Sequence, residues 1–228
     1  MARSLACLLL LFFAAGCAVT PPGSRPAPRL EPLPPAEPPR SIVDLVGWRD
    51  DHPFLLASAV WEPGGSARRV QAAVLERVSG DHKEVVLAMV EGDRLVAVLP
   101  LANILVGGRQ RRIVGALLTQ LDVGPSNRAL RVDVRTFESG EAQLFAVKTT
   151  LLAMEGDRPV RMLDRLVESG DKLRDRRADV AVKDVDGDGT PELVVDEHES
   201  GSAPAHTLVY RRGPDGRYVT KDRSIFDE

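Results

Sequence analysis

From residue 53 onward, the chain alternates short apolar runs with polar turns. Each run is rich in Val, Leu and Ala, and Gly, Asp, Ser or Pro residues separate it from the next run. Runs of this length, bounded by such residues, are typical of β-strands joined by tight turns. The hydrophobic pattern therefore predicts a β-rich fold for most of the chain.

One order of elements recurs within this part of the chain. An apolar run is followed by Glu, then by Pro or Ser, then by Gly, and then by a second apolar run. The three turns of this kind are residues 62–64, 138–140 and 199–201. Two further pairs of segments match, residues 87–99 with 152–163 and residues 109–123 with 174–185, at a spacing of about 63 residues. Matches near one period indicate internal repeats.

We expect an all-β fold built from about three degenerate β-repeats. Four strands in ~60 residues is the size of one β-propeller blade, but three units are fewer than a usual closed ring. The repeats are therefore expected to form a partial propeller-like or curved antiparallel sheet assembly. Short helices are predicted at residues 41–46 and 160–168, and the second segment fits a strand as well.

The first residues of the chain follow a different pattern. Arg3 precedes an apolar run over residues 5–13, which is followed by the sequence AAGC ending at Cys17. A positive charge, an apolar run and a small-residue cleavage site form a secretory signal. The AAGC ending resembles a bacterial lipobox, with Ala14 where Leu is usual. The resemblance implies cleavage before Cys17 and lipidation of that cysteine. An ordinary signal peptide with a chance cysteine is the alternative.

A proline-rich segment comes next, since nine of residues 21–40 are Pro. Such a segment favours extended polyproline II over sheet or helix, so we expect a disordered tether. The expected organisation is a lipoprotein signal peptide (1–16), a lipidated cysteine with its tether (17–40) and a β-repeat domain (41–228). Because Ala18 follows the cysteine, the lipoprotein resemblance implies export and lipid anchoring in the cell envelope, at the outer membrane, on its periplasmic or surface face.

Charge and cysteine content limit what the domain can do. The net charge of −3, with acidic and basic residues interspersed, provides no basic footprint for nucleic acid. Both cysteines, Cys7 and Cys17, precede the domain. The domain is therefore left without a thiol for a disulfide or for a cysteine metal site.

The most specific chemical motif is DVDGDGTPEL, which begins at residue 184. The aspartates at loop positions 1, 3 and 5 are Asp184, Asp186 and Asp188. Gly189 stands at position 6, where a calcium loop needs a sharp turn. Carboxylates this close repel one another unless a cation lies between them. An EF-hand has Glu at position 12 and a helix after it, whereas Val195 here belongs to an expected strand.

The strand–loop–strand arrangement resembles the FG-GAP or VCBS repeat of the integrin-α type, over residues 178–212. The resemblance implies one Ca²⁺ site. Its ligands would be Asp184, Asp186, Asp188 and Glu192, with Thr190 contributing its backbone carbonyl. The corresponding loops of the other copies lack alternating aspartates, so one site is expected. An Asp-Gly turn that binds no metal is the alternative.

Two other groups of charged residues could carry chemistry. The residues Asp, Glu, His and Glu at 196–199 could perform hydrolytic acid–base chemistry if their side chains converged in a pocket. They lack the ligand spacing of a zinc protease and occupy the repeated strand-to-turn position, which favours a solvated hairpin end. The arginine runs at 109–112 and 174–177 could bind an anion, but solvated edge strands explain them as well.

We therefore expect a membrane-anchored cell-envelope lipoprotein whose calcium-stabilised β-repeat domain is a non-catalytic binding or assembly module, not an enzyme. The expected partners are the membrane, through the N-terminal lipid, and a protein or glycan, but no nucleic acid. One alternative is a periplasmic inhibitor or immunity protein directed against a wall hydrolase. Another is a hydrolase that uses the carboxylates at 196–199, and a third is a purely structural envelope protein.

Overall fold

The computed structural model describes residues 31–32, 41–48, 51–64, 68–105, 111–124, 127–140, 143–171, 174–201 and 206–227. In these residues the fold is all-β, with one short helix, α1 (Ser41–Val46), at the predicted place. The expected signal peptide and Cys17 lie outside the described residues, as does the tether apart from residues 31–32. None of the helices in the described part is long and apolar enough to cross a membrane.

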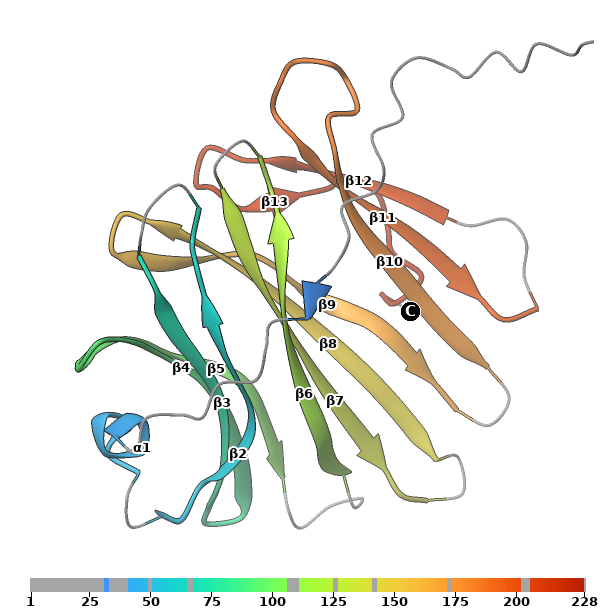
Figure 1. The fold of residues 1–228 in the computed structure, drawn as a ribbon. Helices are drawn as coiled ribbons and strands as arrows, with labels where there is room; N and C mark the ends of the chain where they lie inside the picture. The colour runs from blue at the N-terminus through green and yellow to red at the C-terminus, as the bar shows by residue number, and fades with distance from the viewer. Residues whose placement is uncertain are drawn as a thin grey trace, which may run out of the picture.

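The strands form two antiparallel sheets (Figure 1). The four-stranded sheet consists, in spatial order, of β2 (Phe54–Trp61), β3 (Val70–Ser79), β4 (His82–Glu91) and β5 (Arg94–Leu105). The nine-stranded sheet consists, in spatial order, of β1 (Glu31–Pro32), β6 (Arg111–Asp122), β7 (Arg128–Glu138), β8 (Leu144–Glu155), β9 (Arg158–Gly170), β10 (Asp175–Lys183), β11 (Glu192–Glu199), β12 (His206–Arg212) and β13 (Tyr218–Val219). Neither sheet closes on itself.

Strands β6 to β13 follow one another in the large sheet in chain order. A propeller would divide them among separate blades, so the curved-sheet alternative describes this arrangement. The curl brings distant strands together. A Cβ on Gly124, just after β6, would lie 3.7 Å from Cγ of Pro191, just before β11. Five strand spacings of a flat sheet would place these strands about 24 Å apart.

The three repeated turns all join adjacent antiparallel strands, as expected. Residues 62–64 follow β2 and precede β3, residues 138–140 begin at the last residue of β7 and precede β8, and residues 199–201 begin at the last residue of β11 and precede β12. The turn at 91–93 follows the first of these turns by two strands, whereas its match at 155–157 follows the second by only one. The strand structure is therefore repeat-like in its hairpins, but the number of strands between matched turns is not constant.

The helix and the two sheets are stacked in layers. Successive residues of a strand point to opposite faces, and β3 and β4 are apolar on both. One face packs against α1 in a cluster that includes Ile42 and Leu75. The other face packs against β6, β7 and β8 in a core that includes Leu87 and Leu130. A third cluster, around Leu151, packs on part of the inner face of the curled sheet.

Two segments show how long-range pairing decides local structure. Residues 160–168, which fit helix or strand, lie within β9 because this segment pairs with β8 over its length. Residues 31–32 form β1, although the tether was expected to contain no sheet. Glu31 and Pro32 pair with Gln120 and Thr119 at the outer edge of β6. An edge strand tolerates proline, since no further strand needs its missing N–H.

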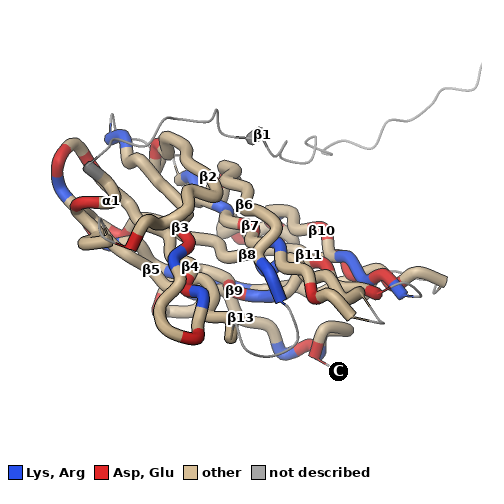
Figure 2. Tube along the Cα trace, turned by 90° about the horizontal axis from the view of Figure 1, so that it is seen from below, with Lys and Arg blue, Asp and Glu red and all other residues tan. Residues whose placement is uncertain are grey.

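Charged residues of both signs are interspersed along the strands and turns (Figure 2). One arginine run departs from the expected edge position. The segment that contains Arg176 and Arg177 begins β10, which pairs with β9 on one side and β11 on the other. Arg176 instead donates to Glu199 on β11 over 3.1 Å and to the carbonyl of Ile225 over 2.7 Å. Protection of an edge therefore does not explain this run.

Candidate metal centre

The DVDGDGTPE loop connects β10 to β11, which pair as a hairpin from Lys183 opposite Glu192 to Arg176 opposite Glu199. The loop is thus flanked by strands on both sides, as predicted, and β11 instead of a helix comes directly after it. This context is the one that distinguishes the loop from an EF-hand.

The aspartates and glycines of the loop create its tight turns. Both carboxylate oxygens of Asp184 accept backbone hydrogen bonds, from Gly187 N–H at 2.8 Å and from Gly189 N–H at 3.1 Å. Gly187 and Gly189 have φ values of 78° and 86°. Side chains other than glycine rarely adopt this left-handed conformation. Glycine at these two positions therefore lets the loop wrap around its first aspartate.

The wrapped loop gathers the three aspartates. One carboxylate oxygen from each of Asp184, Asp186 and Asp188 lies within 4.8 Å of the others, and all three residues are exposed. Arg211 on β12 supplies one neighbouring positive charge, with its Nε 3.8 Å from Asp186. Three carboxylates this close repel one another unless a cation intervenes. The cluster could hold a metal ion.

The other two predicted ligands are placed differently. Glu192 is 4% exposed, and its Oε2 accepts a hydrogen bond from the N–H of Val185 at 2.8 Å. Glu192 lies outside the three-aspartate group. Its hydrogen bond to Val185 holds the start of the loop close to the first residue of β11. Thr190 donates its N–H to Asp188 Oδ1 at 2.6 Å. The loop therefore gathers three of the five expected ligands, while Glu192 is bonded to Val185 at the start of the loop and the N–H of Thr190 is bonded to Asp188.

The donor set fits a hard cation. All the groups brought together are carboxylate oxygens, which Ca²⁺ and Mg²⁺ prefer, while soft sulfur and imidazole ligands are missing from this cluster. Because the three aspartates are exposed, water can complete a coordination shell of six or more oxygens.

The carboxylates at 196–199 do not converge. Neighbouring residues alternate across β11, so Asp196 and His198 lie on the face opposite to Glu197 and Glu199. Asp196 accepts from Thr207 at 2.6 Å, and His198 is exposed, 4.0 Å from Asp179. Glu199 lies beside Arg176. The condition for a shared catalytic pocket is therefore not met in this segment. The expected solvated hairpin end is also wrong for Glu197, which is 1% exposed.

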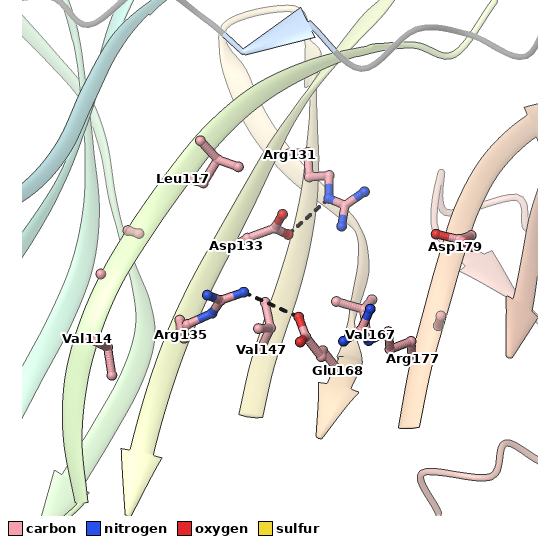
Figure 3. A pocket seen from close by; sticks show the side chains of 13 residues that line it. Val114, Leu117, Arg131, Asp133, Arg135, Val147, Val167, Glu168, Arg177 and Asp179 are labelled. Carbon is pink, nitrogen blue, oxygen red and sulfur yellow. Dashed lines mark hydrogen bonds and ion pairs between the residues drawn. The ribbon is translucent and has the colours of Figure 1, made fainter. Parts of the chain in front are cut away.

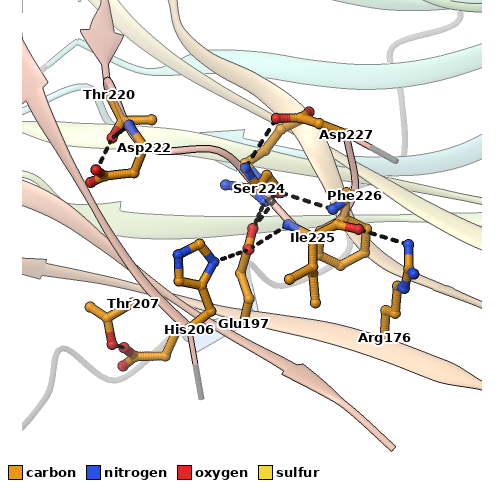
Figure 4. A network of polar contacts seen from close by, with 12 residues as sticks. Arg176, Glu197, His206, Thr207, Thr220, Asp222, Ser224, Ile225, Phe226 and Asp227 are labelled. Carbon is orange, nitrogen blue, oxygen red and sulfur yellow. Dashed lines mark hydrogen bonds and ion pairs between the residues drawn. The ribbon is translucent and has the colours of Figure 1, made fainter. Parts of the chain in front are cut away.

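Glu197 points inward because partners far away in the sequence surround it (Figure 4). Its Oε1 accepts from Arg165 on β9 and from the Ser224 hydroxyl at 2.6 Å, and its Oε2 accepts from the Ile225 N–H at 2.9 Å. Nδ1 of His206 lies 3.3 Å from Oε2. No sequence motif marks this group, because its members come from β9, β11, β12 and the segment after β13.

These contacts lower the pKa of Glu197. Burial by itself raises that pKa, but the hydrogen bonds from Ser224, Ile225 and Arg165, together with the Arg165 charge, outweigh it. The carboxylate is therefore held ionised in the protein interior. In the same cluster, burial raises the pKa of Tyr210, whose hydroxyl accepts from Arg165 at 2.5 Å.

In comparisons with known proteins, no family model, curated protein or solved structure matches the chain. Fold and site define a curled antiparallel sheet packed on a smaller sheet, with an acidic hairpin loop between β10 and β11.

Proposed function

We propose that this chain is a cell-envelope lipoprotein whose β-domain is a calcium-braced, non-catalytic binding or assembly module. The lipid would be carried by Cys17, and the proline-rich segment would hold the domain away from the membrane. The partner would be a protein or a glycan. The proposal joins the lipobox-like start of the sequence to the acidic loop at 184–192.

The observation that carries the proposal is the gathering of Asp184, Asp186 and Asp188 within 4.8 Å. Calcium is the cation that best matches an exposed set of carboxylates, because it accepts six to eight oxygens without strict geometry. Magnesium demands a near-ideal octahedron and keeps more of its water. The FG-GAP-type resemblance of the same segment points to the same ion.

The position of Glu192 supports a structural role for the ion. Its buried carboxylate ties Val185 of the loop to the start of β11. A cation on the neighbouring aspartates would hold the end of β10 and the start of β11 together. We limit the FG-GAP assignment to this hairpin, because β6 to β13 pair in one sheet instead of in separate blades.

Calcium titration calorimetry on the purified full-length chain tests the metal part of the proposal. We expect one Ca²⁺ per chain, with affinity in the ~10⁻⁴ to 10⁻³ M range of extracellular modules. Asp186→Ala should remove the binding. Asp122→Ala is the matched control, since Asp122 begins the related loop of another copy and has a 70% exposed side chain. Equal binding by wild type and Asp186→Ala would refute the site.

Detergent-phase partitioning tests the anchor independently. The chain expressed in a bacterium that processes lipoproteins should enter the detergent phase and incorporate labelled fatty acid. Cys17→Ser should abolish both results, because the thiol is the acylation site. Incorporation of label into Cys17→Ser, or its absence from wild type, would contradict the lipoprotein assignment and leave the calcium result unaffected.

A further inference from the structure

A cavity of about 470 Å³ opens on the inner face of the curled sheet, and none of its lining residues belongs to the acidic loop. Strands β6 to β10 line it, and their side chains approach one another across it (Figure 3). A cavity of this size falls within the range of small-molecule sites in proteins. Its two walls, on β6 and β10, differ in chemistry.

The β6 wall is apolar and accessible. Val114 and Leu117 line the cavity, yet their exposed fractions are 54% and 48%. Gly115 lies between them, and a Cβ added there would meet nothing within 4 Å. On the floor, Val147 and Val167 add further apolar surface. This side of the cavity can therefore accept an alkyl chain or a ring.

The floor of the cavity is built by the alternating sequence of β7. Val132 and Val134 face the core between the sheets, so Arg131, Asp133 and Arg135 face the cavity. The Nε of Arg131 donates to Asp133 at 2.9 Å, and both side chains are nearly buried, at 11% and 14% exposed. This inner pair is therefore already engaged within the floor of the cavity.

Two guanidinium groups remain at the mouth of the cavity. Arg135 lies 3.4 Å from Glu168 and has a 58% exposed side chain. Arg177, 66% exposed, extends toward Glu168 from the opposite wall (Figure 3). It forms an ion pair with Asp175, outside the cavity, at 2.9 Å. Exposed pairs of this kind contribute little stability, so an incoming anion can exchange with them at small cost.

A solvated sheet face is the simpler explanation for charged side chains on a strand. It does not account for the exposed Val114 and Leu117, which share the cavity with arginines instead of lying in a dry core. It also does not account for Arg131 and Asp133, which are withdrawn from water. Apolar surface beside convergent polar groups is the usual composition of a ligand site.

We propose that this cavity binds an amphiphilic organic anion. Its carboxylate or phosphate head lies between Arg135 and Arg177, and its apolar body lies against Val114 and Leu117 over Gly115. Guanidinium groups recognise both head groups through charge-assisted hydrogen bonds. Asp179, also on the rim, is 88% exposed and lies 4.0 Å from His198, whereas the Glu168 carboxylate lies beside Arg135 and has to move aside for the head group. The site is independent of the calcium loop.

Titration calorimetry of the full-length chain with four probes tests the chemical class. Octanoate and octyl phosphate, used below their micelle concentrations, should bind with a stoichiometry of one, and the tighter of them identifies the preferred head group. Octylamine has the same chain with the opposite charge, and acetate has the head alone, so both should bind at least tenfold more weakly. Octylamine binding as tightly as octanoate, or no binding of either octyl anion at millimolar concentration, would overturn the proposal.

Variants locate the site. Arg135→Gln or Arg177→Gln should weaken octyl-anion binding about tenfold, because each removes a charge-assisted hydrogen bond worth roughly 1.4 kcal/mol in affinity. Arg69→Gln is the control, since Arg69 is similarly exposed, at 69%, and lies just before β3 of the other sheet. An equal loss of affinity in Arg69→Gln would show non-specific attraction and overturn the site.

Gly115→Leu blocks the cavity without removing a charge. Gly115 pairs with Arg135, so the new side chain shares its face, and Gly115 lies outside the left-handed φ region. The variant should keep the wild-type melting temperature and lose octyl-anion binding. Gly140→Leu, in the loop after β7, also meets open space and should bind normally. Wild-type affinity in Gly115→Leu would refute the location.

Discussion

Arg165 on β9 donates a hydrogen bond to the carboxylate of Glu197 on β11, although β10 lies between these strands in the sheet. The contact is possible because β9 and β10 pair through only three residues, at 168–170 and 175–177, and then separate. Ser224, in the segment after β13, bonds to both side chains. The ion pair and the C-terminal segment together cover the opening between β9 and β10.

Glu197→Gln should lower the unfolding free energy by about 3–5 kcal/mol. The substitution removes the negative charge and leaves the Arg165 guanidinium, only 9% exposed, without its counterion. Urea unfolding at neutral pH measures the change. Glu199→Gln is the matched control on the same strand, where a part-exposed pair with Arg176 should contribute less than ~1 kcal/mol. Equal losses in the two variants would contradict the special role of the buried pair.

Acid should weaken the same contact. The pKa of Glu197 is lower in the folded protein than its ordinary value, so the folded state binds this proton less readily than the unfolded state. The stabilisation is complete above the unfolded pKa and is lost as pH falls through the lowered folded pKa. The difference in unfolding free energy between wild type and Glu197→Gln should therefore be constant near neutral pH and shrink below the ordinary Glu range. A difference that grows on acidification would reverse the assignment.

Ser224→Ala should loosen the C-terminal segment. Its hydroxyl donates to Glu197 at 2.6 Å, and accepts from Arg165 at 2.9 Å and from the Phe226 N–H at 3.1 Å. Losing this buried hydroxyl should cost about 1–3 kcal/mol. Amide hydrogen exchange should accelerate at Ile225 and Phe226 before it accelerates in β8. Thr220→Ala, which removes an exposed hydroxyl beside Asp222, should leave those amides unchanged.

Local chemistry predicted the hairpins and the acidic loop. The Glu-x-Gly turns mark strand ends, because each turn has an apolar run before it and another after it in the sequence. The gathering of Asp184, Asp186 and Asp188 follows in the same way, since alternate aspartates and two glycines specify a tight loop within a few residues.

Contacts between distant segments could not be read from the sequence. Glu197 looked like part of a solvated turn because its partners, Arg165 and Ser224, are 32 and 27 residues away. Likewise, strands β6 through β13 form one sheet because of strand pairing, and the residues of the turns do not determine that pairing. The cavity had a readable signal, the alternation of charged residues and valine in β7, but its second wall comes from β10, more than 40 residues later.

Thermal unfolding of the full-length chain, with millimolar Ca²⁺ or with excess chelator, tests the central claim most directly. At ten times its dissociation constant, an ion bound only by the folded state adds roughly 1.4 kcal/mol. For a chain of this size that corresponds to a rise of about 3–6 °C in melting temperature. We predict this rise for wild type and for Asp122→Ala, and none for Asp186→Ala. A melting temperature that calcium leaves unchanged in wild type, or raises equally in Asp186→Ala, would contradict a calcium-braced fold.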